Sequence, residues 1–298
     1  MQIGFIGLGR MGANMVALLL EKGHEVVAFD INAEAVEEAQ GRGATGVGSI
    51  AELVEQLEAP RAVFVMVQRT HVQGVVDELS PLLSEGDTIV DSGNTFYKET
   101  LERVAKANEQ GLNFIDVGVS GGTERARTGA TLMVGGPRDV VERLEPVFTD
   151  LAQEGGYGHM GESGAGHFVK MVHNGIEYGM MQAIGEGMQA IDEARDQFGT
   201  DLGTVLSVYN HGSIVESSLV AWSLEAWKKD PGLTEIEGSV PTGDTEAEME
   251  SLSELAQMPA LDVALQERKK SRQLPTLSGK FVAAMRKEFG SHPVNKKQ

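Results

Sequence analysis

The sequence contains no cysteine and no long apolar run, and both absences limit what the protein can be. Without cysteine there are no disulfides and no thiolate chemistry, and a zinc site would lack its best ligand. No run approaches the roughly 20 apolar residues that a membrane-spanning helix needs. The opening residues MQIGFIGLG also lack the basic and hydrophobic regions of a signal peptide. We therefore expect a cytoplasmic protein.

Positive charge is also scarce in this chain. Lys and Arg number 25 against 44 Asp and Glu, which gives a formal net charge of −19. Because phosphate contacts need a basic surface, this composition disfavours nucleic-acid binding. An anionic metabolite would need a local pocket of cations and backbone N–H groups. The acidity fits either solubility through self-repulsion or adaptation to high salt, and composition does not choose between them.

A glycine-rich turn lies near the N-terminus, inside a strand–turn–helix–strand pattern. Residues 2–7 predict a strand, residues 13–24 have helical periodicity, and EVVAFD at 25–30 predicts a second strand. The turn consists of Gly7, Leu8, Gly9, Arg10, Met11 and Gly12. In this context a GxGxxG turn is typical of dinucleotide binding, because the helix N-terminus faces the pyrophosphate. A glycine-rich turn of another kind of α/β protein is the weaker alternative.

Asp30 ends the second strand, about 20 residues beyond the glycines, where such folds hold the adenosine ribose. Its carboxylate can accept hydrogen bonds from the ribose hydroxyls and would repel the 2′-phosphate of NADP. The chain has no cation between Asp30 and Arg42. We therefore predict that NAD is preferred, with NADP possible. Asp30 could instead cap the following helix, although Asn32 could do so equally well.

Four further apolar runs predict strands that alternate with helices. They lie at 62–67, 87–94, 113–122 and 131–136. This alternation is typical of a doubly wound sheet whose ligand crevice lies at the carboxyl ends of the strands. We expect a Rossmann-type α/β domain over residues 1–162. Candidate ligand contacts are the residues that end or follow these strands: Val67, Gln68, Asn94, Ser120, Gly121 and Gly122.

From residue 163 the strand pattern stops, and residues 163–298 predict an all-α domain. Its first segment reads as one long helix despite its glycines, each of which costs roughly 1 kcal/mol relative to alanine. We therefore expect something to pack closely against that helix. At about 100° per residue, one face carries a polar stripe opposite Val169, Val172 and Ile176. The stripe consists of Lys170, His173, Asn174, Glu177 and Tyr178. A solvated face would explain the lysine and glutamate alone, whereas all five together favour an active site.

The chain resembles the short form of the decarboxylating 6-phosphogluconate dehydrogenase family, within the β-hydroxyacid dehydrogenase superfamily. The resemblance rests on GFIGLGRMG at 4–12, DSGN at 91–94, DVGVSGG at 116–122, GAGHFVKMVHNGIEY at 164–178 and RKEFGSH at 286–292. The glycine turn is shared across the superfamily. The segment KMVHNGIEY is more specific, because relatives that act on other 3-hydroxy acids keep only part of it.

This resemblance implies oxidation of 6-phosphogluconate to ribulose 5-phosphate and CO₂, a step of the oxidative pentose phosphate pathway. The lysine matching Lys170 takes the proton from the C3 hydroxyl as hydride leaves for the nicotinamide. The glutamate matching Glu177 protonates C1 of the enediol, and Asn174 belongs to the same catalytic group. A lysine base must be neutral, which burial beside a cationic nicotinamide favours. No metal is required, because the protonated lysine can assist decarboxylation.

The resemblance also implies substrate contacts and an oligomer. The implied contacts are Asn94, Ser120, Gly121, Gly122, His173, Asn174, Tyr178, Arg286 and His292. In relatives the last two come from the neighbouring subunit and bind phosphate, so we expect a homodimer or homotetramer with exchanged C-terminal tails. The alternative for RKEFGSH is a solvated helix end with a disordered tail.

Two departures from the family pattern concern the phosphate. Near residues 209–218 the family carries an arginine, and this chain has Glu216. VPTGDTEAEME at 240–250 stands where relatives have a glycine-rich, tryptophan-containing segment. Both departures keep open a dehydrogenase of another 3-hydroxy acid, such as 3-hydroxyisobutyrate or an unphosphorylated sugar acid. A catalytically idle nucleotide sensor is a third alternative, which the presence of both Lys170 and Glu177 disfavours.

Overall fold

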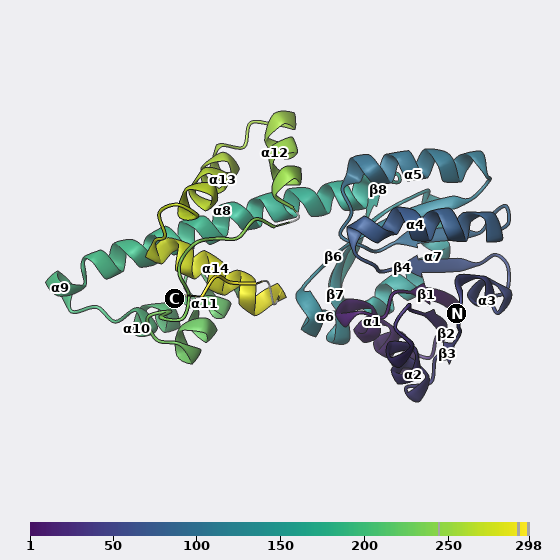
Figure 1. Cartoon of the computed structure of the whole chain (residues 1–298), viewed down its shortest axis with the longest axis horizontal. Helices are drawn as coiled ribbons and strands as arrows, with labels where there is room; N and C mark the ends of the chain where they lie inside the picture. The colour runs from purple at the N-terminus through teal and green to yellow at the C-terminus, as the bar shows by residue number, and fades with distance from the viewer. Residues whose placement is uncertain (244, 291–292, 297–298) are drawn as a thin grey trace. The chain divides into compact units, whose positions relative to one another are not determined.

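The computed structural model describes residues 1–243, 245–290 and 293–296, and the chain divides into two compact units. The first unit is Met1–Met171 and the second is Val172–Gln298. The first is α/β and the second is helical (Figure 1). No described helix is both long and apolar enough to cross a membrane.

The first unit is built on an eight-stranded sheet in the order β3-β2-β1-β4-β5-β6-β7-β8. Its strands are β1 (Gln2–Ile6), β2 (Glu25–Phe29), β3 (Thr45–Gly46), β4 (Ala62–Val65), β5 (Thr88–Asp91), β6 (Asn113–Ser120), β7 (Ala130–Gly135) and β8 (Ala152–Gly161). All neighbouring strands are parallel except β6 and β7. The predicted Rossmann-type α/β domain is confirmed.

Two details of the sheet differ from what the sequence suggests. The strand predicted at 131–136 is present as β7, but it runs antiparallel to β6. The connection between them is too short for a parallel crossover, which takes a dozen residues or more. Strand β8 was not predicted, because its sequence AQEGGYGHMG is neither apolar nor regularly alternating.

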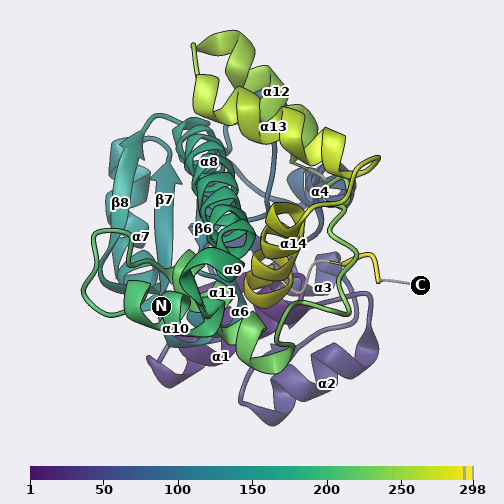
Figure 2. The ribbon, with the colours of Figure 1, turned by 90° about the vertical axis from the view of Figure 1, so that its left-hand side faces the viewer.

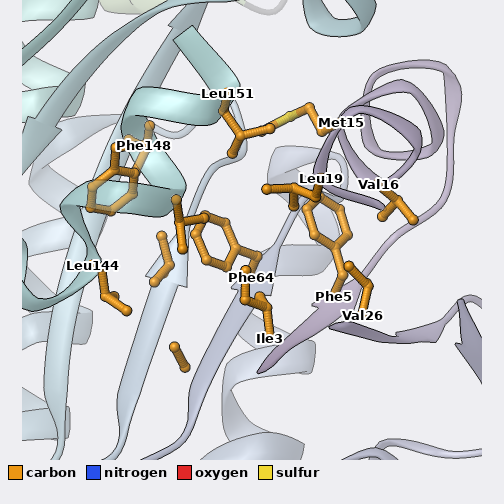
Figure 3. Packing of buried hydrophobic residues seen from close by; sticks show 14 of the residues in the cluster. Ile3, Phe5, Met15, Val16, Leu19, Val26, Phe64, Leu144, Phe148 and Leu151 are labelled. Carbon is orange, nitrogen blue, oxygen red and sulfur yellow. The ribbon is translucent and has the colours of Figure 1, made fainter. Parts of the chain in front are cut away.

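Helices cover both faces of the sheet. The helices of the first unit are α1 (Arg10–Glu21), α2 (Ala33–Gly41), α3 (Ile50–Glu55), α4 (Arg69–Leu79), α5 (Tyr97–Glu109), α6 (Gly122–Thr128) and α7 (Arg138–Leu151), with a 3₁₀ turn η1 (Ser80–Leu82). On one face, α1 and α7 enclose a cluster in which Phe5 stacks on Phe64 at 5.9 Å (Figure 3). On the other, α3, α4 and α5 cover a second apolar cluster. Because both faces are buried, the strands read as continuous apolar runs.

The second unit consists of helices around the later turns of α8. The helices are α8 (Ala165–Glu193), which begins in the first unit, α9 (Arg195–Phe198), α10 (Leu202–Tyr209), α11 (Ser218–Lys229), α12 (Glu246–Leu255), α13 (Pro259–Ser271) and α14 (Leu277–Gly290). Helix α12 packs on α13 and α11 on α14 (Figure 2). Its described residues form only an isolated bridge between Ile236 and Lys296, so the predicted helical domain is confirmed.

The packing of helix α8 explains where the two units divide and why this helix contains glycines. A Cβ at Gly166 would lie 2.4 Å from the Met133 carbonyl oxygen, so the first turns of α8 press on the sheet. The compact units therefore change after Met171, later than the boundary suggested by the strand pattern. Further along, a Cβ at Gly185 would lie 2.8 Å from the Ser278 carbonyl oxygen of α14. The expected close packing is confirmed at both places.

Candidate active site

The glycine turn between β1 and α1 is shaped by close backbone contacts. Gly7 has a φ of +101°, and a Cβ there would lie 2.4 Å from the Met66 carbonyl oxygen. A Cβ at Gly12 would lie 2.0 Å from the Gly7 carbonyl oxygen. At Gly9, by contrast, none of the described residues approaches within 4 Å of the Cβ position. The open space lies in front of the α1 N-terminus, where backbone N–H groups suit a pyrophosphate. Arg10 is exposed beside this space, and Met11 is half-buried.

Asp30 closes this turn from the end of β2. One carboxylate oxygen accepts a hydrogen bond from the Leu8 N–H at 2.6 Å, and the other accepts one from the Asn32 N–H at 2.8 Å. Asn32, not Asp30, caps α2, because its side chain accepts from the Glu34 N–H at 3.1 Å. The alternative role of Asp30 as a cap is therefore wrong, and its carboxylate is held at the turn with lone pairs left for ribose hydroxyls.

Two loops at the carboxyl ends of β4 and β5 carry the exposed side chains of Gln68 and Asn94. The loops touch, because a Cβ at Gly93 would lie 3.0 Å from the Val67 carbonyl oxygen. Asp91 accepts a hydrogen bond from the Gly93 N–H at 3.1 Å and so fixes the turn before Asn94. Since β1, β4, β5 and β6 are parallel, these loops and the glycine turn share one edge of the sheet.

Strand β6 brings two further parts of the candidate site together. After Ser120, Gly121 has a φ of +121° and Gly122 one of +69°, a conformation that favours glycine at both positions. Two residues before Ser120, a Cβ at Gly118 would lie 2.4 Å from the Cβ of Lys170. The stem of Lys170 therefore rests directly on β6, near the edge where the loops meet.

In the second unit, the residues of the polar stripe of α8 are half-buried or buried. Tyr178 is 7% exposed, whereas Ile176, expected on the opposite face, is 55% exposed. His173, Asn174 and Glu177 are half-buried. His173 Nδ1 lies 3.4 Å from Asn174 Oδ1 and 3.9 Å from Glu177 Oε2. These three side chains form one polar group along the helix.

Tyr178 is held by two elements that the sequence did not point to. Its hydroxyl lies 2.9 Å from the Thr245 hydroxyl, just before α12. The Arg268 guanidinium of α13 lies 3.4 Å from the centre of its ring, a cation–π contact. Arg268 and Arg286 interact electrostatically with Tyr178, and Arg272 interacts with Arg286. We call Arg268, Arg272 and Arg286 the arginine cluster.

Two members of the arginine cluster, Arg268 and Arg286, are buried, whereas Arg272 is exposed. Burial lowers the pKa of Arg268 to about 10, and its Nε has no hydrogen-bond partner within the described part of the chain. Burial also lowers the pKa of Arg286, whose Nη1 donates to the Pro241 carbonyl at 2.9 Å. Arg272 pairs with Glu246 and donates to the Val240 carbonyl at 3.1 Å. Arg268, a desolvated cation whose Nε has no partner among the described residues, therefore suits an anionic ligand.

Sequence reasoning missed Arg268 and Arg272 because they lie in ERKKSR, which reads as a solvated helix end. Of the three consecutive cationic residues on α13, Arg268 is buried, whereas Lys269 and Lys270 are exposed. The i, i+4 spacing of the two arginines was the available signal, since it places them on one face. Because the sequence does not show what packs against that face, the spacing alone could not distinguish a buried face from an exposed one.

The sequence singled out three residues for their effect on phosphate binding. Arg286 donates to the Pro241 carbonyl of its own chain, and its role in a neighbouring subunit's site stays a prediction. His292 lies outside the described residues. Glu216 accepts a hydrogen bond from the Gly212 N–H at 2.7 Å and so closes its own exposed loop.

Comparisons with known proteins agree with this geometry. Residues 2–161 match the model for the NAD binding domain of 6-phosphogluconate dehydrogenase, and residues 166–232 match that for its C-terminal domain. The chain is 43% identical over all of both chains to Bacillus subtilis YqeC, provisionally named a 6-phosphogluconate dehydrogenase. It is 39% identical to the Haloferax volcanii NAD(+)-dependent, decarboxylating 6-phosphogluconate dehydrogenase, covering 100% of this chain and 99% of that one.

A solved structure extends the likeness to three dimensions. Plasmodium falciparum 6-phosphogluconate dehydrogenase, solved in its apo form and in complexes with NADP+ and with 6-phosphogluconate, aligns with a TM-score of 0.82 at 27% identity. The alignment covers 92% of this chain and 62% of that chain. The present chain therefore lacks a counterpart to a large part of that longer relative.

Proposed function

We propose that this chain, which belongs to the 6-phosphogluconate dehydrogenase family, oxidises 6-phosphogluconate and releases CO₂ and ribulose 5-phosphate. The observation that carries the proposal is the buried Arg268 stacked on Tyr178. Tyr178 lies on α8, the helix that also bears Lys170, Asn174 and Glu177. A phosphate at the arginine cluster would anchor the far end of a substrate whose reacting carbons face these side chains.

The first unit fits the nicotinamide cofactor that its family model implies. The space before Gly9 and the α1 N-terminus suit the pyrophosphate, and Asp30 suits the adenosine ribose. When bound, the cofactor supplies the acceptor for the C3 hydride. We propose that NAD is preferred, because the carboxylate of Asp30 would face the 2′-phosphate of NADP with no cation beside it in the following helix.

We propose that two side chains, Lys170 and Glu177, carry out the proton transfers. Lys170 takes the proton of the C3 hydroxyl as the hydride leaves C3, which gives a 3-keto acid. The resulting ammonium then hydrogen-bonds the new carbonyl and stabilises the enediolate as the carboxylate leaves as CO₂. Glu177 donates a proton to C1 of this enediolate, whose oxygen becomes the carbonyl of the ketose. Lys170 and Glu177 are two turns apart on α8, which suits groups that serve adjacent carbons.

The remaining polar residues bind and orient the substrate. We propose that the carboxylate and hydroxyls of the substrate are bound by Asn94, Ser120, Gly121, Gly122, His173 and Asn174. We assign the phosphate to Tyr178, Arg268 and Arg286, because a dianion needs charge-assisted donors and arginine can offer two at once.

Steady-state kinetics with a panel of acids tests the proposal. 6-Phosphogluconate, gluconate and 3-hydroxyisobutyrate are each assayed with NAD and with NADP, and CO₂ release is measured beside cofactor reduction. We expect the highest kcat/KM for 6-phosphogluconate with NAD, and one CO₂ for each NADH. A higher kcat/KM for either unphosphorylated acid would show that the chain is a dehydrogenase of another 3-hydroxy acid.

We also propose a homodimer or homotetramer in which the residues after Gly290, including His292, serve the neighbouring subunit. Two inactive forms are mixed: a chain truncated after Gly290, and a full-length Lys170→Met chain. Activity should return, since one mixed site would hold an intact Lys170 and a partner's tail. Mixed oligomers that are seen by native mass spectrometry but have no activity would contradict tail exchange.

A further inference from the structure

We propose that Asp116 is a positioning residue that fixes the start of α8, and with it Lys170, against the sheet. The inference rests on the proposed function only in the role given to Lys170. Asp116 itself is fully buried in β6 and reaches no solvent, so it acts through the helix and not on the substrate.

The contacts of Asp116 join a central strand to the helix that follows the sheet. One carboxylate oxygen accepts a hydrogen bond from the Gly164 N–H, and the other accepts one from the His167 N–H at 2.7 Å. Both N–H groups lie at the N-terminus of α8, where backbone donors have no partner within the helix. A carboxylate there also meets the positive end of the helix dipole. Asp116 therefore caps α8 from a residue far away in the sequence.

Glycines allow the start of α8 to pack closely against the sheet. A Cβ at Gly135 would lie 2.6 Å from the Asp116 Oδ1 and equally close to the Gly166 nitrogen. A Cβ at Gly166 would lie 2.5 Å from the Asp116 carbonyl oxygen. The backbone of α8 thus touches the backbones of β6 and β7 directly. Lys170 follows one turn after Gly166, with its stem on Gly118.

A second buried contact ties the same turn to α5. His167, 2% exposed, places its Nδ1 2.8 Å from the Thr100 hydroxyl and 3.9 Å from Asp116 Oδ2. On the neighbouring strand, Asp91 is the register partner of Asp116. Burial raises the pKa of Asp116, while His167 and the two backbone hydrogen bonds oppose that shift and Asp91 adds to it. The start of α8 is thus held from two directions by buried groups.

Removal of Asp116 should therefore move Lys170 without touching substrate. A misplacement of about 1 Å at a catalytic group can cost roughly 100-fold in rate. For Asp116→Ala we expect kcat for 6-phosphogluconate to fall roughly 100-fold, with KM for NAD within about twofold of the wild type. Asp116→Asn keeps one acceptor oxygen and should recover about tenfold of that loss.

Asp87→Asn is the matched control for a merely structural effect. Asp87 is also buried, and it accepts hydrogen bonds from the Arg61 N–H at 2.7 Å and the Ser84 N–H at 2.9 Å. It precedes β5, so it lies at the opposite end of that strand from Asp91 and the candidate site. We expect Asp87→Asn to lower Tm at least as much as Asp116→Asn while kcat stays within about twofold of the wild type.

Two measurements that need no turnover separate this inference from the proposed function. Amide hydrogen exchange should become at least tenfold faster over residues 165–171 in Asp116→Asn, but not in Asp87→Asn. The pH dependence of Lys170 acetylation, followed by mass spectrometry, should shift in the same variant only. If the wild type does not oxidise 6-phosphogluconate, the proposed function fails while these two readouts still decide the role of Asp116. Unchanged exchange and labelling in Asp116→Asn, or an equal loss of kcat in Asp87→Asn, would overturn it.

Discussion

The two units of this chain use buried charge near their candidate site residues in different ways. In the first unit, the buried carboxylates Asp91 and Asp116 accept hydrogen bonds from backbone N–H groups. In the second, the guanidinium groups of Arg268 and Arg286 are buried, and so are the side chains of Glu246 and Glu248. The Arg268 guanidinium lies 3.4 Å from the centre of the Tyr178 ring. The first unit therefore uses these acids to hold a loop and a helix end in place, whereas we propose that the buried arginines of the second bind the phosphate of a ligand.

This difference shows how a chain with a net charge of −19 can accommodate anions. A dinucleotide pyrophosphate can be bound by backbone N–H groups at a helix N-terminus, which needs no positive side chain. In the second unit's cluster, next to the N-terminus of α12 at Thr245, a terminal phosphate dianion would be bound by arginine side chains. The predictions below test this division, from the largest expected effect to the smallest.

The largest effect should come from Lys170→Met. With no base for the C3 hydroxyl, kcat for 6-phosphogluconate should fall by about 10⁴-fold. The Kd for NAD, measured by calorimetry, should be unchanged, because the glycine turn that suits the cofactor is intact. Full turnover by this variant would contradict the assignment of the base.

Glu177→Gln separates the oxidation from the later protonation and is the companion to Lys170→Met. Cofactor reduction should remain measurable, while formation of ribulose 5-phosphate slows by roughly 100-fold, since only the later protonation loses its acid. Stopped-flow absorbance and product analysis follow the two steps. Equal loss of both steps would assign Glu177 to oxidation as well.

Arg268→Met should have the next largest effect, and it should fall on one ligand only. The expected loss in kcat/KM for 6-phosphogluconate is roughly 100-fold, in line with removal of a buried charged partner, while KM for NAD is unchanged. Lys269→Met on the exposed face of α13 is the control and should change neither constant. Because burial already disfavours the Arg268 cation, Tm should fall little in the methionine variant. A similar rise in both KM values would show that Arg268 supports the fold and not the phosphate.

Asp30→Ala tests whether the carboxylate of Asp30 sets the preference for NAD over NADP. The ratio of kcat/KM for NADP to that for NAD should rise about tenfold, since repulsion of the 2′-phosphate is removed. Asn32→Ala, which removes only the cap of α2, should lower Tm and leave the ratio unaltered. A wild type that prefers NADP would show that Asp30 does not set the choice.

The smallest effect should be a pH dependence of stability from Asp116. Its pKa is raised in the folded protein by burial, so its contribution is full below the unfolded pKa and is lost as pH rises through the folded pKa. Asp116→Asn does not titrate. Its Tm relative to the wild type should therefore rise as pH increases from about 4, by about 2–4 °C for each kcal/mol. A difference in Tm that is constant with pH would contradict the raised pKa.

The candidate site was predictable where a local backbone rule selects the residue. Gly7 and Gly12 could be identified because their positions tolerate no side chain, and the structure shows that a Cβ would clash at both. Arg268 could not, because it lies among exposed charged residues and differs from them only in burial. The direction of β7 was also hidden, since a strand's apolar pattern is the same in either direction.

The sequence by itself determined the Rossmann-type sheet, the helical second unit and the polar stripe of α8, because hydrophobic period and glycine positions are local properties of the chain. Only the tertiary structure decided that Asp116 caps α8, that Gly118 carries the stem of Lys170 and that Arg268 stacks on Tyr178. Each of these contacts joins residues from separate elements, and its partner depends on how β6, α8 and α13 pack within their units. Packing of this kind depends on the shape and burial of whole elements, which no short stretch of sequence records.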